Sequence, residues 1–134
     1  MNTRLLMASS AISLAAIGLG LTFLAGEAAA AIQPGAGSAV QLAVQLLGAL
    51  YVGFALLNWM AKDSVIGGIY NRPIAIGNFA HFLVGGLALL KGLLRQPELP
   101  RSLWVLAGLY ILFGACFGWL FLHAPVNRSG NKPR

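Results

Sequence analysis

Four long runs of apolar residues limit what this chain can fold into. They cover residues 5–25, 40–60, 73–94 and 102–122. A membrane-crossing helix needs about 20 predominantly apolar residues, so each run is long enough to span a bilayer. Only 9% of the residues are charged and the mean hydropathy is +0.79, which is too apolar for a soluble domain of this size. We therefore expect a single all-α domain over residues 1–134, a polytopic membrane protein built as a four-transmembrane-helix bundle.

Charged residues and proline mark the ends of these runs. Lys62 and Asp63 follow the second run, and Pro73 opens the third, where its missing N–H costs nothing in the first helical turn. The first run also resembles a secretory signal, because a charged start precedes it and an alanine tract follows it. Since it is longer than the usual signal core of roughly 7 to 15 residues, we expect a retained helix, with cleavage near Ala30 as the alternative.

The basic residues are divided unevenly between the two ends of such a bundle. The side that carries both termini holds Arg4, Lys62, Arg72, Arg128, Lys132 and Arg134, and the opposite side holds Lys91, Arg95 and Arg101. Because cytoplasmic connections are enriched in Lys and Arg, we expect both termini in the cytoplasm. The connection 26–39 has no Lys or Arg and agrees with an external position, whereas the third connection disagrees.

The net charge of +6 does not by itself indicate a nucleic-acid partner. Basic residues that bind nucleic acid form a patch or stripe, often with aromatic residues between them. Here they stand singly or in pairs beside apolar runs, as at membrane flanks. We expect no nucleic-acid partner.

Small residues are the expected contacts between the helices, because lipid tails are as apolar as Leu and give no hydrophobic driving force. A helical projection places Ser9, Ser13, Ala16, Gly20 and Glu27 on one face of the first helix, which we predict to face inward. Four glycines are predicted to pack helix against helix: Gly48, Gly85, Gly114 and Gly118. The spacing of the last two also fits a dimer seam, which stays open as an alternative.

Polar side chains within the runs are candidate functional residues, because they are costly at bilayer depth. At 1.5 Å per residue, His81 and Ser13 lie about 12 Å from the same boundary, with Asn78 one turn shallower. If their helices adjoin, four residues would line a polar pocket open to the cytoplasm: His81, Asn78, Ser13 and Asn58. His81 could there bind a head group or relay a proton. Alternatively, these residues hydrogen-bond between helices and fix the packing.

No cofactor or metal site is expected. His81 and His123 differ by roughly 12 Å in depth, so one monomer cannot use both as ligands of a haem iron. There is no third histidine, and no Asp or Glu falls at mid-membrane depth. The lack of an intramembrane acidic residue also argues against a coupled transporter.

The connection between the second and third runs is too hydrophobic for a free loop. We expect residues 62–73 to lie at the membrane interface. Lys62 and Arg72 would there contact anionic lipid phosphates, helped by the N-terminus of the third helix.

The second and fourth runs share a short pattern. Leu-Tyr-x-x-Phe-Ala at residues 50–55 matches Leu-Tyr-x-x-Phe-Gly at residues 109–114. Short apolar segments match easily, so we interpret the pattern as chance, with two related hairpins as the alternative.

Parts of the sequence resemble a known group. The segments are Asn-Trp-Met at 58–60, Gly-Gly-Ile-Tyr-Asn-Arg-Pro at 67–73 and Asn-Phe-Ala-His-Phe at 78–82. They are similar to a group of small bacterial four-helix membrane proteins of uncharacterised activity. In size and helix layout, the chain also resembles the DoxX-like proteins. The resemblance implies a four-helix fold and a bacterial inner membrane, and it carries over no catalytic residue.

From these features we expect a non-enzymatic inner-membrane protein, an accessory or lipid-interacting component whose partners are membrane lipids. A homo-oligomer or a larger membrane complex stays open. Two other functions remain as alternatives: a small oligomeric transporter or channel, and a quinone- or lipid-handling enzyme subunit with a pocket near His81.

Overall fold

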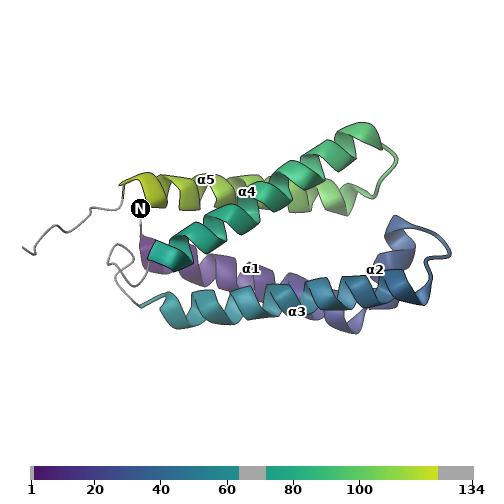
Figure 1. Cartoon of the computed structure of the whole chain (residues 1–134), viewed down its shortest axis with the longest axis horizontal. Coiled ribbons are helices and arrows are strands. Elements are labelled where there is room, and N and C mark those ends of the chain that lie inside the picture. Colours follow the sequence, from purple (N-terminus) through teal and green to yellow (C-terminus); the bar gives the residue numbers. More distant parts are fainter. Residues whose placement is uncertain (1, 64–71, 124–134) are drawn as a thin grey trace, which may run out of the picture.

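A computed structural model describes residues 2–63 and 72–123, which form five helices (Figure 1). They are α1 (Thr3–Phe23), α2 (Ala25–Ile32), α3 (Ser38–Ala61), α4 (Arg72–Arg95) and α5 (Arg101–His123). All but α2 are long and apolar enough to cross a membrane. The prediction of an all-α fold with four membrane-spanning helices is confirmed, and the predicted helix ends lie within two residues of the observed ones.

The first connection contains a helix that was not predicted. Residues 25–32 are rich in alanine, the strongest helix former, and they form α2 immediately after α1 ends. Gly35, with a φ of +77°, then supplies the turn that leads to α3. The chain thus covers the end of the α1 and α3 pair with a short helix instead of an open loop.

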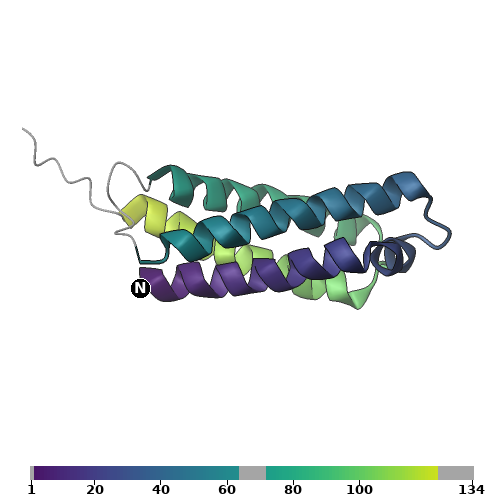
Figure 2. The same ribbon diagram turned by 90° about the horizontal axis from the view of Figure 1, so that it is seen from below.

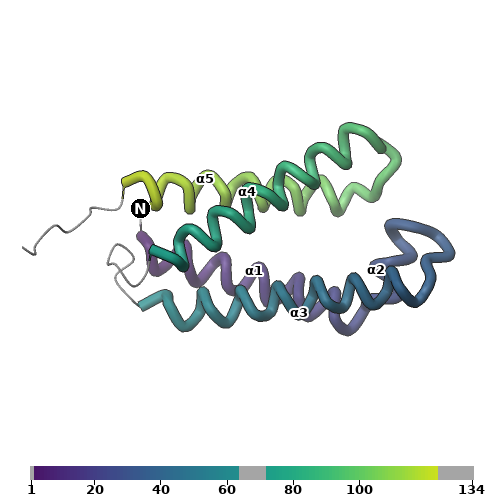
Figure 3. Tube along the Cα trace, in the orientation of Figure 1, coloured from purple at the N-terminus to yellow at the C-terminus, as the bar shows by residue number. Residues whose placement is uncertain are grey.

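The long helices pair as two antiparallel hairpins (Figures 1 and 2). One hairpin is α1 packed along α3, and the other is α4 packed along α5. Helices of different hairpins approach each other less closely. The tube in Figure 3 shows that the hairpins lie near each other at the end that holds the N-terminus and diverge toward the end that holds α2.

Glycines allow the close approach of α1 and α3. A Cβ on Gly48 would lie 2.8 Å from the carbonyl oxygen of Gly18 and 2.5 Å from Thr22 Oγ1. A Cβ on Gly18 would lie 2.9 Å from the carbonyl oxygen of Gly48. Real Cβ atoms essentially never come this close, so the crossing needs glycine on both helices.

The prediction for the inward face of the first helix is wrong. Ala16 is exposed, and a Cβ on Gly20 would meet nothing within 4 Å. The buried face of α1 is formed instead by Leu6, Met7, Ser10, Ala11, Leu14 and Gly18. Glycine is thus required at the α3 crossing, and the rest of this face mixes large side chains with Ser10 and Ala11.

Aromatic rings pack on the glycines of the other hairpin. The ring of Tyr110 lies directly against Gly85, and a Cβ on Gly118 would lie 2.9 Å from the ring of Phe79. A Cβ on Gly114 would lie at ordinary contact distance from the α4 backbone, 3.7 Å from the nitrogen of Leu83. Gly85, Gly114 and Gly118 are therefore used within the chain, between α4 and α5.

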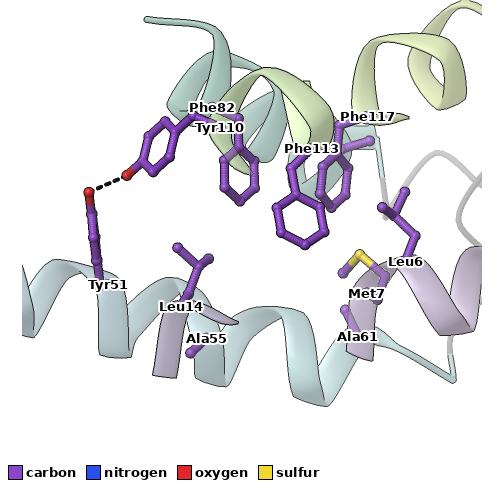
Figure 4. Packing of buried hydrophobic residues seen from close by; sticks show 11 residues of the cluster. Leu6, Met7, Leu14, Tyr51, Ala55, Ala61, Phe82, Tyr110, Phe113 and Phe117 are labelled. Atoms are coloured by element: carbon purple, nitrogen blue, oxygen red, sulfur yellow. Dashed lines mark hydrogen bonds between the residues drawn. The ribbon is translucent and has the colours of Figure 1, made fainter. Parts of the chain in front are cut away.

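Large side chains fill the space between the hairpins (Figure 4). Phe82 and Phe117 stack with their ring centroids 5.8 Å apart, and Phe113 lies 5.1 Å from Phe82. Met7 and Leu14 of α1 belong to the same buried cluster. The core is thus aromatic where α4 and α5 contribute and aliphatic where α1 contributes, and α3 adds Tyr51 and Ala55.

Some predictions concern residues that the structure does not describe. They are the interfacial position of the connection, for residues 64–71, and the location of Arg128, Lys132 and Arg134. Retention of the first helix also stays a prediction, although α1 supplies Met7 and Leu14 to the core.

Candidate functional site

The first polar group in the bundle joins three helices. Ser10 of α1, Asn58 of α3 and Asn78 of α4 are each fully buried. The two amides bond reciprocally, with each Nδ2 donating to the other Oδ1 at 2.7 Å. Asn58 Nδ2 also donates to Ser10 Oγ at 3.0 Å, and Asn78 Nδ2 donates to the carbonyl of Ile74 at 2.9 Å. We call these three residues the asparagine joint.

The asparagine joint has no donor left for a ligand. Each amide NH₂ has two hydrogens, and both are used in Asn58 and in Asn78. Ser10 donates its own hydrogen to the carbonyl of Met7 at 2.9 Å. A polar group with all donors paired holds helices together at little cost. For the two asparagines, this arrangement favours the packing role over ligand binding.

The second polar group lies among aromatic rings. Tyr110 of α5 is hydrogen-bonded to the hydroxyl of Tyr51 of α3 (Figure 4), and its Oη lies 3.0 Å from Nε2 of His81 of α4. The His81 ring stacks on Phe54, with centroids 4.6 Å apart, and meets Tyr51 edge-on. Both tyrosines are buried and His81 is half-buried. We call Tyr51, His81 and Tyr110 the tyrosine–histidine cluster.

The tyrosine–histidine cluster forms part of the wall of a cavity of about 530 Å³ between the hairpins. All five helices contribute to the lining, which apart from the cluster consists of aliphatic side chains and Gly85. Ile17 of α1, Ile32 of α2, Leu47 of α3, Val84 of α4 and Leu106 of α5 are examples. Among the described lining residues, polar side-chain atoms come from the cluster alone.

The structure does not gather the four predicted pocket residues into one site. Asn58 and Asn78 lie together, but His81 belongs to the tyrosine–histidine cluster. Ser13 lines a different cavity of about 580 Å³ between α1 and α5. Ser10 takes the position expected for Ser13, because residues three apart on a helix differ by roughly 60° in direction.

Sequence reasoning missed Ser10 and both tyrosines as site residues. Tyrosine in an apolar run is usually a core or interface residue, so its presence alone was no reason to choose it. The shared pattern of residues 50–55 and 109–114 was the available signal. It places Tyr51 and Tyr110 at equivalent positions of the second long helix of each hairpin, and these two hydroxyls meet.

The residues predicted to contact lipid head groups lie at the end of the bundle that holds the N-terminus. Lys62 Nζ donates to the carbonyl of Trp59 at 3.2 Å and lies 4.0 Å from the centroid of the Trp59 ring. Asp63 pairs with Arg4 at 2.9 Å and with Lys62 at 3.5 Å. Arg72 is exposed at the start of α4. Contact of Lys62 and Arg72 with phosphates stays a prediction.

Searches among protein-family models, curated proteins and solved structures found no match to this chain. In residues 2–63 and 72–123, no three His, Cys, Asp or Glu side chains gather as metal ligands would. The function is therefore inferred from the two polar groups and the cavity.

Proposed function

We propose that this protein is a non-enzymatic multi-pass membrane protein that binds a lipid-phase molecule in the cavity between its hairpins. The supporting observation is the composition of the cavity wall, which is aliphatic except for the tyrosine–histidine cluster. Small-molecule sites usually have volumes of roughly 300 to 1,000 Å³, mostly apolar walls and a few converging polar groups. A cavity of about 530 Å³ with one polar cluster fits this description.

The surrounding solvent favours a lipid-phase occupant over water. A water molecule needs two to four polar partners, and an apolar cavity stays dry. Among the described residues that line the cavity, only those of the tyrosine–histidine cluster offer polar side-chain partners. Hydrocarbon is the available material at this depth, so an alkyl or isoprenoid chain fills the apolar part of the cavity.

The asparagine joint supports this function by holding the hairpins in place. It connects α1 and α3 to α4 through side chains that are fully buried. The hairpins diverge toward the end that holds α2 (Figure 1). Residues of both hairpins line the cavity. The asparagine joint thus holds the helices together, and the tyrosine–histidine cluster is available to the ligand.

We also propose a cellular location and an orientation for the protein. A bacterial inner membrane with both termini in the cytoplasm is supported by the distribution of Lys and Arg and by the resemblance of residues 58–82 to small bacterial four-helix proteins. A distant relationship to DoxX-like proteins stays a proposal on size and layout.

Native mass spectrometry of the detergent-purified protein with added palmitoyl-oleoyl phosphatidylglycerol tests the function. Leu47→Trp places a bulky indole ring in the cavity wall. Leu46→Trp makes the same change at a neighbouring exposed residue that is not part of this wall. We expect one bound lipid on the wild type and on Leu46→Trp, and a several-fold loss on Leu47→Trp. Equal binding by both variants, or no bound lipid on the wild type, would refute the proposed function.

A further inference from the structure

The tyrosine–histidine cluster has one hydrogen-bond donor more than it can use. Each tyrosine hydroxyl carries one hydrogen, and a neutral imidazole carries one N–H. Two contacts link the three side chains, Tyr51 to Tyr110 and Tyr110 to His81. Three donors and two bonds leave one donor without an acceptor inside the cluster.

The remaining donor belongs to one of the three side chains, depending on the directions of the two bonds. If His81 Nε2–H donates to Tyr110 and Tyr110 donates to Tyr51, the hydroxyl hydrogen of Tyr51 is left. If the bonds run in the opposite direction, Tyr110 donates to Nε2 and the Nδ1–H of His81 is left. If Tyr51 and His81 both donate to Tyr110, the hydroxyl hydrogen of Tyr110 is left. Within the described residues, neither Tyr51 nor His81 has another side-chain hydrogen-bond partner.

All three residues line the cavity. A donor without an acceptor costs free energy when it is buried away from water, and the cost is high in a hydrocarbon environment. An acceptor supplied by the occupant of the cavity removes this cost.

Three kinds of oxygen could accept the hydrogen bond from the leftover donor: an alcohol, an anionic group or a carbonyl. An alcohol brings its own hydrogen, so it accepts one bond and leaves another donor unpaired. A phosphate or carboxylate needs a cation, and no Lys or Arg stands among the described residues that line the cavity. A carbonyl oxygen accepts and brings no hydrogen, so it completes the set of hydrogen bonds.

We propose that the cavity recognises the carbonyl oxygen of a lipid-phase molecule through the leftover donor of the tyrosine–histidine cluster. This inference rests on the proposed function, because it names the ligand chemistry of the same cavity. Two sources supply such an oxygen: the ester group of a glycerolipid and the ring of a quinone. In either case, the hydrocarbon part lies against the aliphatic walls.

The test compares two lipids that differ in the carbonyl group. The probes are a diester phosphatidylglycerol and the dialkyl ether analogue with the same chains, titrated against the purified protein and followed by native mass spectrometry. We expect the wild type to bind the diester about three- to tenfold more tightly, as one neutral hydrogen bond provides. The triple variant Tyr51→Phe/His81→Phe/Tyr110→Phe keeps the rings and should bind both lipids equally.

The control is His123→Phe, because His123 is exposed at the end of α5 and stacks on Trp119 away from this cavity. It should keep the preference for the diester. An infrared spectrum of the diester with ¹³C-labelled carbonyls gives a second readout that needs no variant. Its C=O stretch should shift to lower frequency on binding to the wild type.

The outcomes separate the two proposals. If the wild type binds diester and ether lipids equally, the carbonyl inference is wrong, while the proposed function stands as long as Leu47→Trp still loses lipid. If the wild type binds neither of these lipids nor a short-chain quinone, the proposed function itself fails. Displacement of the diester by a short-chain quinone assigns the carbonyl to a quinone ring, and retention of the diester assigns it to a glycerolipid.

Discussion

At the residue scale, the protein contains two polar groups with opposite hydrogen-bond balance. In the asparagine joint, every amide hydrogen of Asn58 and Asn78 has an acceptor. In the tyrosine–histidine cluster, the same count leaves one donor over. Since a membrane interior supplies few acceptors, this difference separates a structural group from a binding group.

Replacing one member of the asparagine joint should cost more stability than its size suggests. Asn58→Leu leaves the amide of Asn78 without its reciprocal partner, and an unsatisfied buried polar group costs about 1–3 kcal/mol. The double variant Asn58→Leu/Asn78→Leu removes both amides, so it should be more stable than the single variant. Thermal unfolding in detergent measures the difference. A double variant with the summed loss of the two single variants would show that the reciprocal bond is not important.

The sequence predicted Asn58, Asn78, His81 and Ser13 as polar residues at bilayer depth, but not the partners that they have in the structure. Any polar side chain in an apolar run is conspicuous, which is why these residues stood out. Choosing Ser10 over Ser13 requires the rotation of α1 about its axis. That rotation is set by the crossing at Gly18 and Gly48, which no local pattern reveals.

At the element scale, the helices were predictable, but the inward face of the first helix was not. A soluble helix shows its inward face as an apolar stripe, but a membrane helix is apolar on both faces because lipid replaces water. Met7 and Phe82 are fully buried, whereas Met60 is 80% exposed and Phe23 is 79% exposed. The same residue types thus stand on the core and lipid faces, so hydropathy cannot assign a face.

The helix crossing of the first hairpin should depend on glycine at one position and not at another. Gly48→Ala places a methyl group against α1 and should destabilise the protein by about 1–3 kcal/mol, as overpacking does. A Cβ on Gly53 of the same helix would meet nothing within 4 Å, so Gly53→Ala should be neutral or stabilising. The two unfolding midpoints, measured under the same conditions, check the prediction. Equal midpoints would contradict the close crossing.

At the scale of the whole molecule, the four-helix architecture was predictable, but its division into two hairpins was not. The lengths of the apolar runs fix the number of spans. Which helices pack closely depends on contacts between residues far apart in the sequence, such as Gly18 with Gly48 and Gly85 with Tyr110. The cavity follows from that division, because it lies between the hairpins.

The orientation of the whole molecule is open to a direct test. The ends of α1, α3, α4 and α5 that carry Arg4, Lys62, Arg72 and His123 lie on one side of the bundle (Figure 1). Because Lys and Arg favour the cytoplasmic side, a green fluorescent protein fused after residue 134 should fluoresce. Alkaline phosphatase inserted at residues 96–100 should be active. The reverse pair of results would place both termini outside.

The proposed function requires a lipid-phase molecule in the cavity between the hairpins. The most direct measurement is a high-resolution structure of the protein in lipid nanodiscs. We expect elongated density along the aliphatic walls near Leu47 and Val84. Its polar end should lie within hydrogen-bond distance of the tyrosine–histidine cluster. Hairpins closed against each other with no density between them would contradict it.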